Sequence, residues 1–314
     1  MATGIVGATG FIGSYLCHHH VGHKPPRIFT RRAGNAPSIP GAEIQQGDLL
    51  SGPDCERFVR GLDTLYYLAH TNSPVNSDVD QPADATLNLV PFLTLLSAIR
   101  RSGTRPHVVY FSSGGAVYAP RHRRDPIAEC DACAPTSSYG ILKIAAEQYL
   151  RLAADRGELT ATVLRVGNAY GTLLPQYRAQ GLIGVALNQL LHGEPVRIFG
   201  NVSNVRDYVH LRDIAAIAWK VSAPIRPFDV LNVGSGLGHS VRDVLAIIED
   251  CYGSAFPIEV DESSGRWLPE WVVLDNSHAR QDYGWSPTIG LRDGIDALLH
   301  ATSDGLTAYP ALAR

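Results

Sequence analysis

The sequence lacks a strong excess of either charge. Of its 314 residues, 27 are Lys or Arg and 30 are Asp or Glu, which leaves a formal net charge of -3 at pH 7. This composition does not predict the basic surface field that attracts nucleic acid or anionic lipid. We therefore expect a small-molecule partner, and neither nucleic acid nor a membrane. A chain of this length can bury a sizeable core, as one large α/β domain or two smaller ones.

Cysteines and long apolar runs are also scarce. The five cysteines, at positions 17, 55, 130, 133 and 251, are odd in number and scattered, which argues against a disulfide framework and for a reducing compartment. The amino terminus lacks the basic region and apolar run of a signal peptide, and no stretch approaches about 18 uninterrupted apolar residues. We predict a cytoplasmic protein.

Short apolar runs alternate with helical patterns through the first half of the chain. The runs TGIVGA, RIFT, TLYYLA, HVVYFSS and TATVLRV predict strands, and the patterns at 11–22, 83–102 and 138–155 predict helices. This alternation is typical of a parallel sheet covered on both faces. The predicted fold class is a doubly wound α/β sheet with a smaller, discontinuous carboxyl-terminal lobe.

The regular alternation ends at about residue 171, and the later segments are too short to fold alone. The chain resumes a sheet-like pattern at 204–232 and finishes in helical patterns near 240–252, 276–283 and 290–301. We assign 1–171 and 204–232 to the first domain, and 172–203 and 233–314 to the lobe.

A glycine-rich turn, GATGFIG, directly follows the first predicted strand and leads into the first predicted helix. Small residues at this point let the backbone approach a pyrophosphate at the amino end of the helix. A tight turn with close helix packing is the alternative, but the strand-turn-helix context favours a dinucleotide-binding site. The expected cofactor contacts in this turn are Gly7, Thr9, Gly10, Phe11, Ile12 and Gly13.

The end of the second strand bears on the choice of dinucleotide. An acidic residue for the ribose 2′-hydroxyl of NAD is expected there, but Thr30 stands in its place and Arg31 and Arg32 follow. Two guanidiniums suit a 2′-phosphate, so the sequence favours NADP over NAD; solvated arginines beside bound NAD are the alternative. Asp48 is expected to bind the adenine amino group, with a plain loop acid as the alternative, and Leu49 is assigned to the same site.

Several motifs in a fixed order resemble a known family. The glycine turn, YFSSGGAVY, Tyr139 with Lys143, VGNAYG and NVRDYVH are similar to the motifs of the extended short-chain dehydrogenase/reductases, specifically the nucleotide-sugar epimerases of the UDP-galactose 4-epimerase type. The resemblance spans about residues 3 to 300. It implies a Rossmann-like dinucleotide-binding domain and a nucleotide-sugar-binding lobe.

The resemblance implies a catalytic pair in TSSYGILKIAAEQYL. Tyr139 and Lys143 are four residues apart, so on a helix they face the same way. Tyr139 is implied to be the general acid/base, and Lys143 to lower its pKa and to hold the nicotinamide ribose; an exposed helical pair is the alternative. Leu68, Ala69 and His70, at the end of the fourth strand, complete the expected cofactor contacts. His70, Thr71 and Asn72 are also candidates to line the sugar pocket, with a satisfied polar cluster in the loop as the alternative.

The chain departs from the family's pattern at Gly114, where the family usually has a catalytic Ser or Thr. Ser113, just upstream, is expected to supply the missing hydrogen bond, with a backbone role as the alternative. Related dehydratases and decarboxylases need acidic residues at this element, where this chain has Gly115 and Ala116. Related 3,5-epimerase/reductases need a Cys there, so none of these three reactions is expected. Hydride transfer at a single carbinol carbon is the chemistry that remains.

Four residues are candidates for substrate binding. Asn168 in VGNAYG is implied to bind the sugar or its phosphate, and Arg197 in VRIFG a base or phosphate. Arg206 in NVRDYVH and Arg266 in GRWLPEWVVLD suit a pyrophosphate held between two guanidiniums. Structural ion pairs are the alternative for Arg206 and Arg266.

No metal site is predicted. His18, His19 and His20 lie about 100° apart around a helix and cannot converge on one ion, and Cys130 and Cys133 form a single C-x-x-C pair. The helices at 83–102 and 138–155 carry apolar stripes beyond what one core needs. Dimers of the family pair these helices, so a homodimer is expected.

The predicted function is a nucleotide-sugar 4-epimerase that passes hydride to and from a retained nicotinamide cofactor through a 4-keto intermediate. The first alternative is an NADPH-dependent 4-ketoreductase of a keto-deoxysugar nucleotide, which Arg31, Arg32 and Gly114 favour. A non-catalytic dinucleotide sensor is the second alternative, against which the intact Tyr139 and Lys143 argue.

Overall fold

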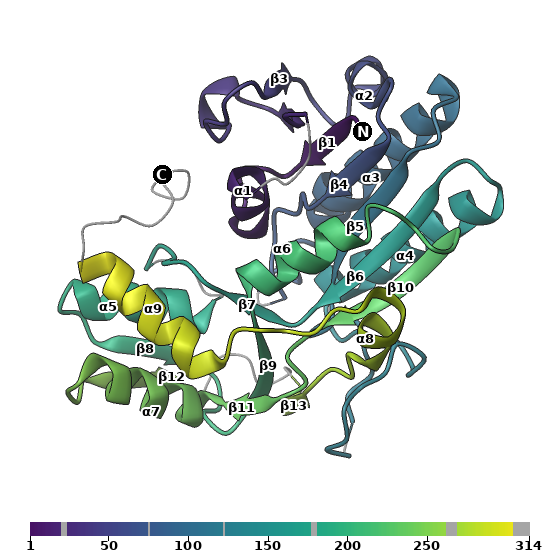
Figure 1. Ribbon diagram of the computed structural model, residues 1–314. Helices are drawn as coiled ribbons and strands as arrows, with labels where there is room; N and C mark the ends of the chain where they lie inside the picture. The colour runs from purple at the N-terminus through teal and green to yellow at the C-terminus, as the bar shows by residue number, and fades with distance from the viewer. Residues whose placement is uncertain (20–23, 75, 122, 177–180, 262–268, 304–314) are drawn as a thin grey trace.

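A seven-stranded parallel sheet forms the centre of the molecule (Figure 1). The computed structural model describes residues 1–19, 24–74, 76–121, 123–176, 181–261 and 269–303. From one edge to the other, the strands of the sheet are β10 (Phe228–Val233), β6 (Thr160–Val166), β5 (His107–Ser113), β4 (Thr64–Tyr67), β1 (Thr3–Val6), β2 (Arg27–Thr30) and β3 (Glu43–Gln46). Every neighbouring pair is parallel, which confirms the predicted fold class.

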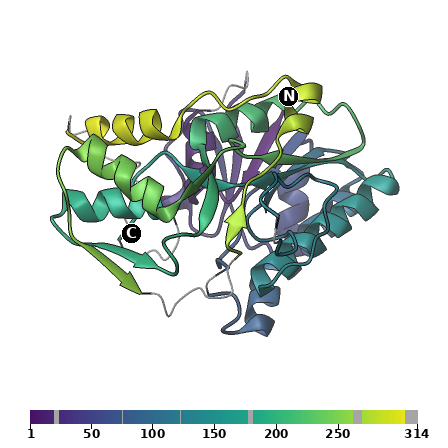
Figure 2. The ribbon, with the colours of Figure 1, turned by 90° about the horizontal axis from the view of Figure 1, so that it is seen from below.

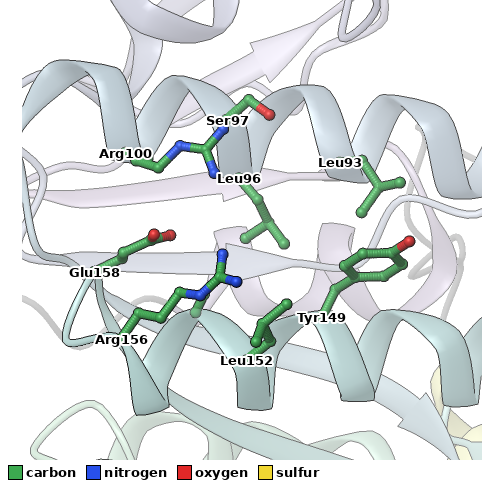
Figure 3. Close-up of a pocket in the computed structure, with 9 residues that line it drawn as sticks. Leu93, Leu96, Ser97, Arg100, Tyr149, Leu152, Arg156 and Glu158 are labelled. Carbon is green, nitrogen blue, oxygen red and sulfur yellow. The ribbon is translucent and has the colours of Figure 1, made fainter.

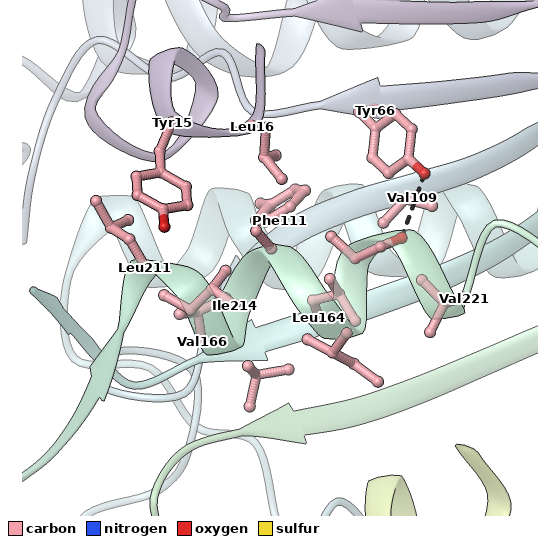
Figure 4. Packing of buried hydrophobic residues seen from close by; sticks show 14 of the residues in the cluster. Tyr15, Leu16, Tyr66, Val109, Phe111, Leu164, Val166, Leu211, Ile214 and Val221 are labelled. Carbon is pink, nitrogen blue, oxygen red and sulfur yellow. Dashed lines mark hydrogen bonds between the residues drawn. The ribbon is translucent and has the colours of Figure 1, made fainter. Parts of the chain in front are cut away.

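Helices cover both faces of this sheet. On one face lie α1 (Phe11–His18) and α6 (Leu211–Lys220), and on the other lie α2 (Gly52–Val59), α3 (Gln81–Ser102) and α4 (Ser138–Asp155) (Figure 1). Apolar residues of α1 and α6 meet Phe111 and Leu164 from the central strands (Figure 4). The Tyr66 hydroxyl donates to the Ala218 carbonyl, 3.3 Å away, so α6 is joined to β4 by a buried hydrogen bond as well as by packing.

Local signals set the ends of the two helices that frame the site. Asp80 accepts a hydrogen bond from Ala83 N, 2.9 Å away, at the start of α3, and Gly103 ends that helix with φ 68°. Ser137 caps α4 by accepting from Gly140 N at 3.2 Å. These caps fix where α4 begins, and therefore where Tyr139 lies.

Helix α3 is the one helix among the described residues that is long and apolar enough to cross a membrane. Of its most apolar window, 44% is buried inside the protein. Phe92, Leu95 and Ile99 of this helix pack in the core beneath the sheet. A core helix of a globular fold gives the same signal, so the match carries little weight.

The second lobe is built from short strands and three helices, which gather at one end of the molecule (Figure 2). Its sheet contains β11 (Gly238–Ser240), β9 (Val205–His210) and β13 (Trp271–Val272), with β7 (Asn168–Tyr170) also paired to β9. A parallel pair, β8 (Val196–Phe199) and β12 (Ile258–Asp261), lies beside it. The helices are α5 (Leu182–Leu191), α7 (Val241–Tyr252) and α9 (Leu291–Ser303); η1 (Ala33–Asn35) and α8 (Ser277–Tyr283) lie outside the lobe core.

The chain passes between the two parts more than once. Helix α6 and strand β10 return to the large sheet, while β9 lies in the sheet of the lobe. The division at 1–171 plus 204–232 stays a prediction. At the large sheet, the strand order reverses around β1, and in open α/β sheets ligands bind beyond the carboxyl ends of the strands at such a reversal.

Candidate active site

The glycine turn after β1 leaves no room for side chains. Gly7 has φ +91°, and a Cβ on it would lie 2.6 Å from the backbone nitrogen of Ala69. A Cβ on Gly13 would collide with the Gly7 carbonyl oxygen. The first turn of α1 carries no side-chain cap at Gly10, so its backbone N–H groups remain available to an anion. The turn therefore fits the pyrophosphate of a dinucleotide.

Other predicted cofactor residues lie around this turn. Leu68 N donates to the Val6 carbonyl, 2.9 Å away, which extends β4 alongside β1 and brings Leu68 and Ala69 against Gly7. Phe11 and Ile12 pack on the core beneath the turn. The end of β4 and the start of α1 thus share one surface.

The polar residues after β2 and β3 are exposed. Thr30 Oγ1 bonds to the backbone of Arg32, and among the described residues neither Arg31 nor Arg32 forms an ion pair. Asp48 accepts a hydrogen bond from Leu50 N at 2.9 Å, so its carboxyl group also shapes its own turn. The two guanidiniums are available to a ligand phosphate, and Leu49 packs inward.

Tyr139 and Lys143, the predicted catalytic pair, lie on one face of α4, as their spacing predicts. Burial raises the pKa of Tyr139 to about 12, and a hydrogen bond with the Ser113 side chain opposes this rise. Lys143 is 4% exposed and donates from Nζ to the Phe111 carbonyl, 2.8 Å away. Its Nζ lies 5.5 Å from the centroid of the Tyr139 ring. Burial lowers the pKa of Lys143 to about 8, although Glu147 acts in the opposite direction.

The structure gives a physical reason for Gly114. A Cβ at this position would lie 2.5 Å from Leu274 Cδ1 and 3.2 Å from the Arg165 carbonyl oxygen, so a Ser or Thr fits only if the Leu274 side chain moves. A Cβ on the next residue, Gly115, would lie 3.8 Å from Asn168 Oδ1 and 3.9 Å from Ser113 Oγ. Asn168 and Ser113, both predicted site residues, therefore lie close to Gly115. Of the two, Ser113 is the residue whose hydroxyl contacts Tyr139.

His70 lies closer to Tyr139 than its sequence position revealed. Its ring meets the ring of Tyr139 edge-on, with centroids 4.6 Å apart. Burial and, to a smaller extent, the charge of Lys143 lower the pKa of His70 to about 2, so the imidazole is neutral. Its Nε2 is buried and has no hydrogen-bond partner in the part of the chain that the structure describes. A neutral imidazole is thus placed to contact a bound ligand, but not to act as a general acid.

The three predicted arginines have different surroundings. Arg206 is partly buried, and its one hydrogen bond runs from Nη1 to the Val205 carbonyl, 2.8 Å away; among the described residues it has no carboxylate partner. Burial lowers its pKa. Arg197 is exposed and pairs with Glu259 across β8 and β12 at 3.2 Å, which is a structural ion pair. Arg266 lies outside the described residues.

A buried network behind the site was not predicted. Glu147 on α4 is 2% exposed and pairs with Arg165 on β6, with 2.7 Å between Oε2 and Nη2. Arg165 also donates to the Tyr118 hydroxyl at 3.0 Å, and that hydroxyl donates to Asn232 Oδ1 at 2.6 Å. The signal in the sequence was the spacing: Glu147 follows Lys143 by the same four residues that separate Lys143 from Tyr139.

The described histidines of α1 bond to the helix backbone, and the paired cysteines are free thiols. His18 Nδ1 and His19 Nδ1 lie 2.8 Å and 3.0 Å from the carbonyls of Ser14 and Tyr15, four residues back along α1. His20 lies outside the described residues. Cys130 and Cys133 are free and exposed. Among the described residues, no cluster of three or more His, Cys, Asp or Glu is arranged to hold a metal ion.

A family model decides the classification of this fold and site. The model of the NAD dependent epimerase/dehydratase family matches residues 4–234. The chain belongs to this family. A nicotinamide cofactor is part of the family's chemistry, and this chain has the Gly7 and Gly13 cradle that fits the pyrophosphate of such a group.

Relatives in the family match the chain over nearly its full length. The UDP-glucose 4-epimerase of Mycolicibacterium smegmatis is 30% identical over 306 residues, covering 94% of this chain and 96% of that protein. The dTDP-4-dehydro-6-deoxyglucose reductase of Escherichia coli is 27% identical and covers 94% and 95%.

Solved structures are similar in the same way. The UDP-glucose 4-epimerase of Thermotoga maritima with UDP-glucose has a TM-score of 0.89 at 25% identity, covering 98% of this chain and 100% of that one. The UDP-glucose 4-epimerase of Thermus thermophilus in complex with NAD has a TM-score of 0.85 at 27% identity, covering 96% and 98%.

Proposed function

We propose that the protein is a nucleotide-sugar 4-epimerase whose substrate is a UDP-sugar. The observation that carries the proposal is the placement of Tyr139 on α4, the helix that follows β5. Its phenol contacts Ser113, and its ring lies beside the Lys143 ammonium. Full-length similarity to several UDP-glucose 4-epimerases supports the same reaction.

The residues around Tyr139 divide the work of proton transfer. Tyr139 removes the proton of the sugar 4-hydroxyl and later returns it, with Ser113 holding the phenol and the sugar oxygen in line. Lys143 provides positive charge beside the phenol, which favours the phenolate. The nicotinamide supplies a reversible hydride acceptor when it is bound. Asn168, across Gly115 from Ser113, is placed to orient the sugar as the 4-keto intermediate turns over.

Arg206 supports a diphosphate-bearing substrate. A buried guanidinium without a carboxylate is costly to desolvate, and an anionic ligand removes that cost by forming charge-assisted hydrogen bonds. Arg206 is such a group. We assign it to the substrate diphosphate, with Arg266 as its expected second guanidinium.

We propose NADP as the preferred cofactor, with NAD as the rival. The support is Thr30 in place of an acid, together with Arg31 and Arg32, whose guanidiniums form no ion pair with any described residue. The similar T. thermophilus structure contains NAD, so the choice needs a direct measurement. Mass spectrometry of the dinucleotide released by denaturing the purified protein identifies it.

A 4-ketoreductase of a keto-deoxysugar nucleotide is the second candidate function. The observation that favours it is the 27% identity to the E. coli dTDP-4-dehydro-6-deoxyglucose reductase. The two activities differ in cofactor use. Interconversion of UDP-glucose and UDP-galactose without net cofactor consumption supports the epimerase, and stoichiometric oxidation of NADPH by a keto sugar nucleotide supports the reductase.

The decisive variant is Tyr139→Phe, which keeps the ring contact with His70 and removes the hydroxyl. Under the proposal, it retains the dinucleotide through gel filtration and loses turnover. Binding without turnover in the unaltered protein, unchanged in Tyr139→Phe, identifies a dinucleotide sensor instead.

We propose a homodimer formed by the outer faces of α3 and α4. Leu87, Val90, Ile141, Tyr149 and Leu152 are large apolar side chains exposed on these helices. A groove of about 240 Å³ runs between the helices, lined by Leu93, Leu96 and Leu152, with Arg100, Arg156 and Glu158 at one end (Figure 3). An exposed apolar area of this kind suits a second copy of the chain. Analytical ultracentrifugation of the wild type and Leu152→Glu tests it.

We further expect a cytoplasmic enzyme, because the free cysteines suit a reducing compartment.

A further inference from the structure

One buried carboxyl group joins three segments around the catalytic tyrosine. Asp84 in α3 is 0% exposed. Its oxygens accept hydrogen bonds from Asn72 Nδ2 at 2.8 Å, Asn88 Nδ2 at 2.7 Å and Ser138 Oγ at 2.7 Å. Among the described residues no Arg, Lys or His forms an ion pair with Asp84. Uncharged side-chain donors therefore satisfy this carboxyl group.

Each donor connects Asp84 to a different residue near Tyr139. Ser138 directly precedes Tyr139 on α4. Asn72 is two residues after His70, whose ring meets the Tyr139 ring edge-on. Asn88 also accepts from Thr71 N at 2.7 Å, so it holds the residue between His70 and Asn72. The Asp84 side chain thus holds the backbone that carries Tyr139 and the segment that carries His70.

The same segment also caps the helix that carries the tyrosine. Ser138 N donates to Asp78 Oδ1 at 2.7 Å, and Tyr139 N donates to Ser77 Oγ at 3.1 Å. These are among the N–H groups at the start of a helix that lack partners within it. A shift of the segment after β4 therefore shifts the first turn of α4, and the phenol with it.

We propose that Asp84 is a positioning residue for the acid/base chemistry of Tyr139. Removing its acceptor oxygens leaves buried donors unsatisfied, and the cheapest response is separation of α4 from the segment after β4. A general acid/base must lie within hydrogen-bond reach of its proton. The kinetic consequence rests on the proposed epimerase function, but the structural consequence does not.

The test is Asp84→Asn, which keeps the size of the side chain and replaces one acceptor oxygen with a donor. We expect kcat for UDP-sugar interconversion to fall about 100-fold, the order associated with a misplacement of about 1 Å. KM and the amount of retained dinucleotide stay near their wild-type values. Amide hydrogen exchange at Ser138 and Tyr139, which needs no substrate, becomes faster.

The matched control is Asp213→Asn on α6. Asp213 is 2% exposed and accepts from Thr288 N at 3.0 Å, Thr288 Oγ1 at 2.7 Å and Ile289 N at 3.1 Å. It is an equally satisfied buried carboxyl group that holds α6 to the chain before α9. We expect it to lose stability, with kcat and exchange at the start of α4 unchanged in the folded protein.

Failure of the positioning role and failure of the proposed function give different results. If Asp84→Asn loses only as much stability as Asp213→Asn, and keeps both kcat and wild-type exchange at Tyr139, the positioning role is refuted. If the wild type itself shows no turnover, the proposed function fails, while faster exchange at Ser138 and Tyr139 in Asp84→Asn alone still supports the positioning role. Should Asp84→Asn not fold, Ser138→Ala removes a single one of the three hydrogen bonds, and the same two measurements apply to it.

Discussion

Two buried arginines, one behind the site and one in the lobe, are held in opposite ways. Arg165 on β6 has the Glu147 carboxylate, the Tyr118 hydroxyl and the Glu129 carbonyl as acceptors. Although burial lowers the pKa of Arg165, the hydrogen bond and charge of Glu147 raise it overall. Arg206 on β9 has a single backbone carbonyl, and burial lowers its pKa. Arg165 therefore has its counter-charge within the chain, whereas no carboxylate among the described residues pairs with Arg206, the residue that we propose for the substrate diphosphate.

The largest expected effect comes from removing the partner of Arg165. Glu147→Ala leaves a buried guanidinium without its carboxylate, and we expect the free energy of unfolding to fall by about 3 to 5 kcal/mol. Urea denaturation followed by circular dichroism measures this. The control is Glu259→Ala, which breaks the exposed pair with Arg197 and is expected to cost about 1 kcal/mol or less. Equal losses in the two variants would contradict the comparison.

The second effect reverses the pattern at Arg206. Arg206→Met removes a buried charge that has no carboxylate, so the free energy of unfolding stays constant or rises. The Kd for UDP rises by at least about 30-fold, equivalent to about 2 kcal/mol, because the diphosphate loses its buried cation. Isothermal titration calorimetry with UDP measures this. Arg292→Met, which breaks an exposed pair between α9 and Asp250 on α7, should leave the Kd unchanged. A large loss of stability in Arg206→Met would place Arg206 with Arg165 instead.

Lys143 offers an intermediate case, a buried cation with a carbonyl partner and a carboxylate farther along its helix. Its folded-state pKa of about 8 is below the ordinary 10.5, so the folded protein bears a desolvation cost below pH 8 that disappears as pH rises toward 10.5. Lys143→Met should therefore be more stable than the wild type below about pH 8, with the difference shrinking at higher pH. Thermal unfolding across this range measures the difference. A gap that widens with pH would show that the partners of Lys143 outweigh its burial.

The smallest effect distinguishes two neighbouring serines. Ser113 contacts the phenol of Tyr139 and lowers its pKa, so Ser113→Ala raises that pKa and moves the acid limb of kcat to higher pH. Each pKa unit corresponds to about tenfold less phenolate near neutrality. Ser112 donates to Glu147 instead, at 2.5 Å, so Ser112→Ala should leave the pH of the acid limb of kcat unchanged. If the acid limb of kcat moved in both variants, the cause would be a disturbance of β5 rather than loss of the Ser113 hydroxyl.

The sequence predicted the central strands of the large sheet because they are buried on both faces. In β5, six of the seven residues are buried, and this produces the continuous apolar run that marks a parallel strand. In β12 all four residues are exposed, so no apolar pattern identified that strand. The gaps in the prediction therefore fall at β3, the mostly exposed edge strand of the large sheet, and in the lobe, where short edge strands depend on their neighbours rather than on their own composition.

The site was predictable where residues share one helix or one motif. Tyr139 and Lys143 meet because four residues make about one turn. The space at Gly114 is filled by Leu274, and the position of Tyr139 depends on Asp84 and Asn72, residues far along the chain in each case. No spacing rule links such residues, because only the packing of separate segments brings them together. His70 was assigned to the cofactor site, but its contact with Tyr139 arises in the same way.

The return of α6 and β10 to the large sheet has a consequence for synthesis on the ribosome. The edge partner of β6 and the helix that covers Tyr66 are encoded after β7, α5, β8 and β9. A nascent chain that has emerged only as far as β6 exposes one bare strand edge and one uncovered apolar face, both of which invite aggregation. Completion of the large sheet must wait until part of the smaller lobe has been translated.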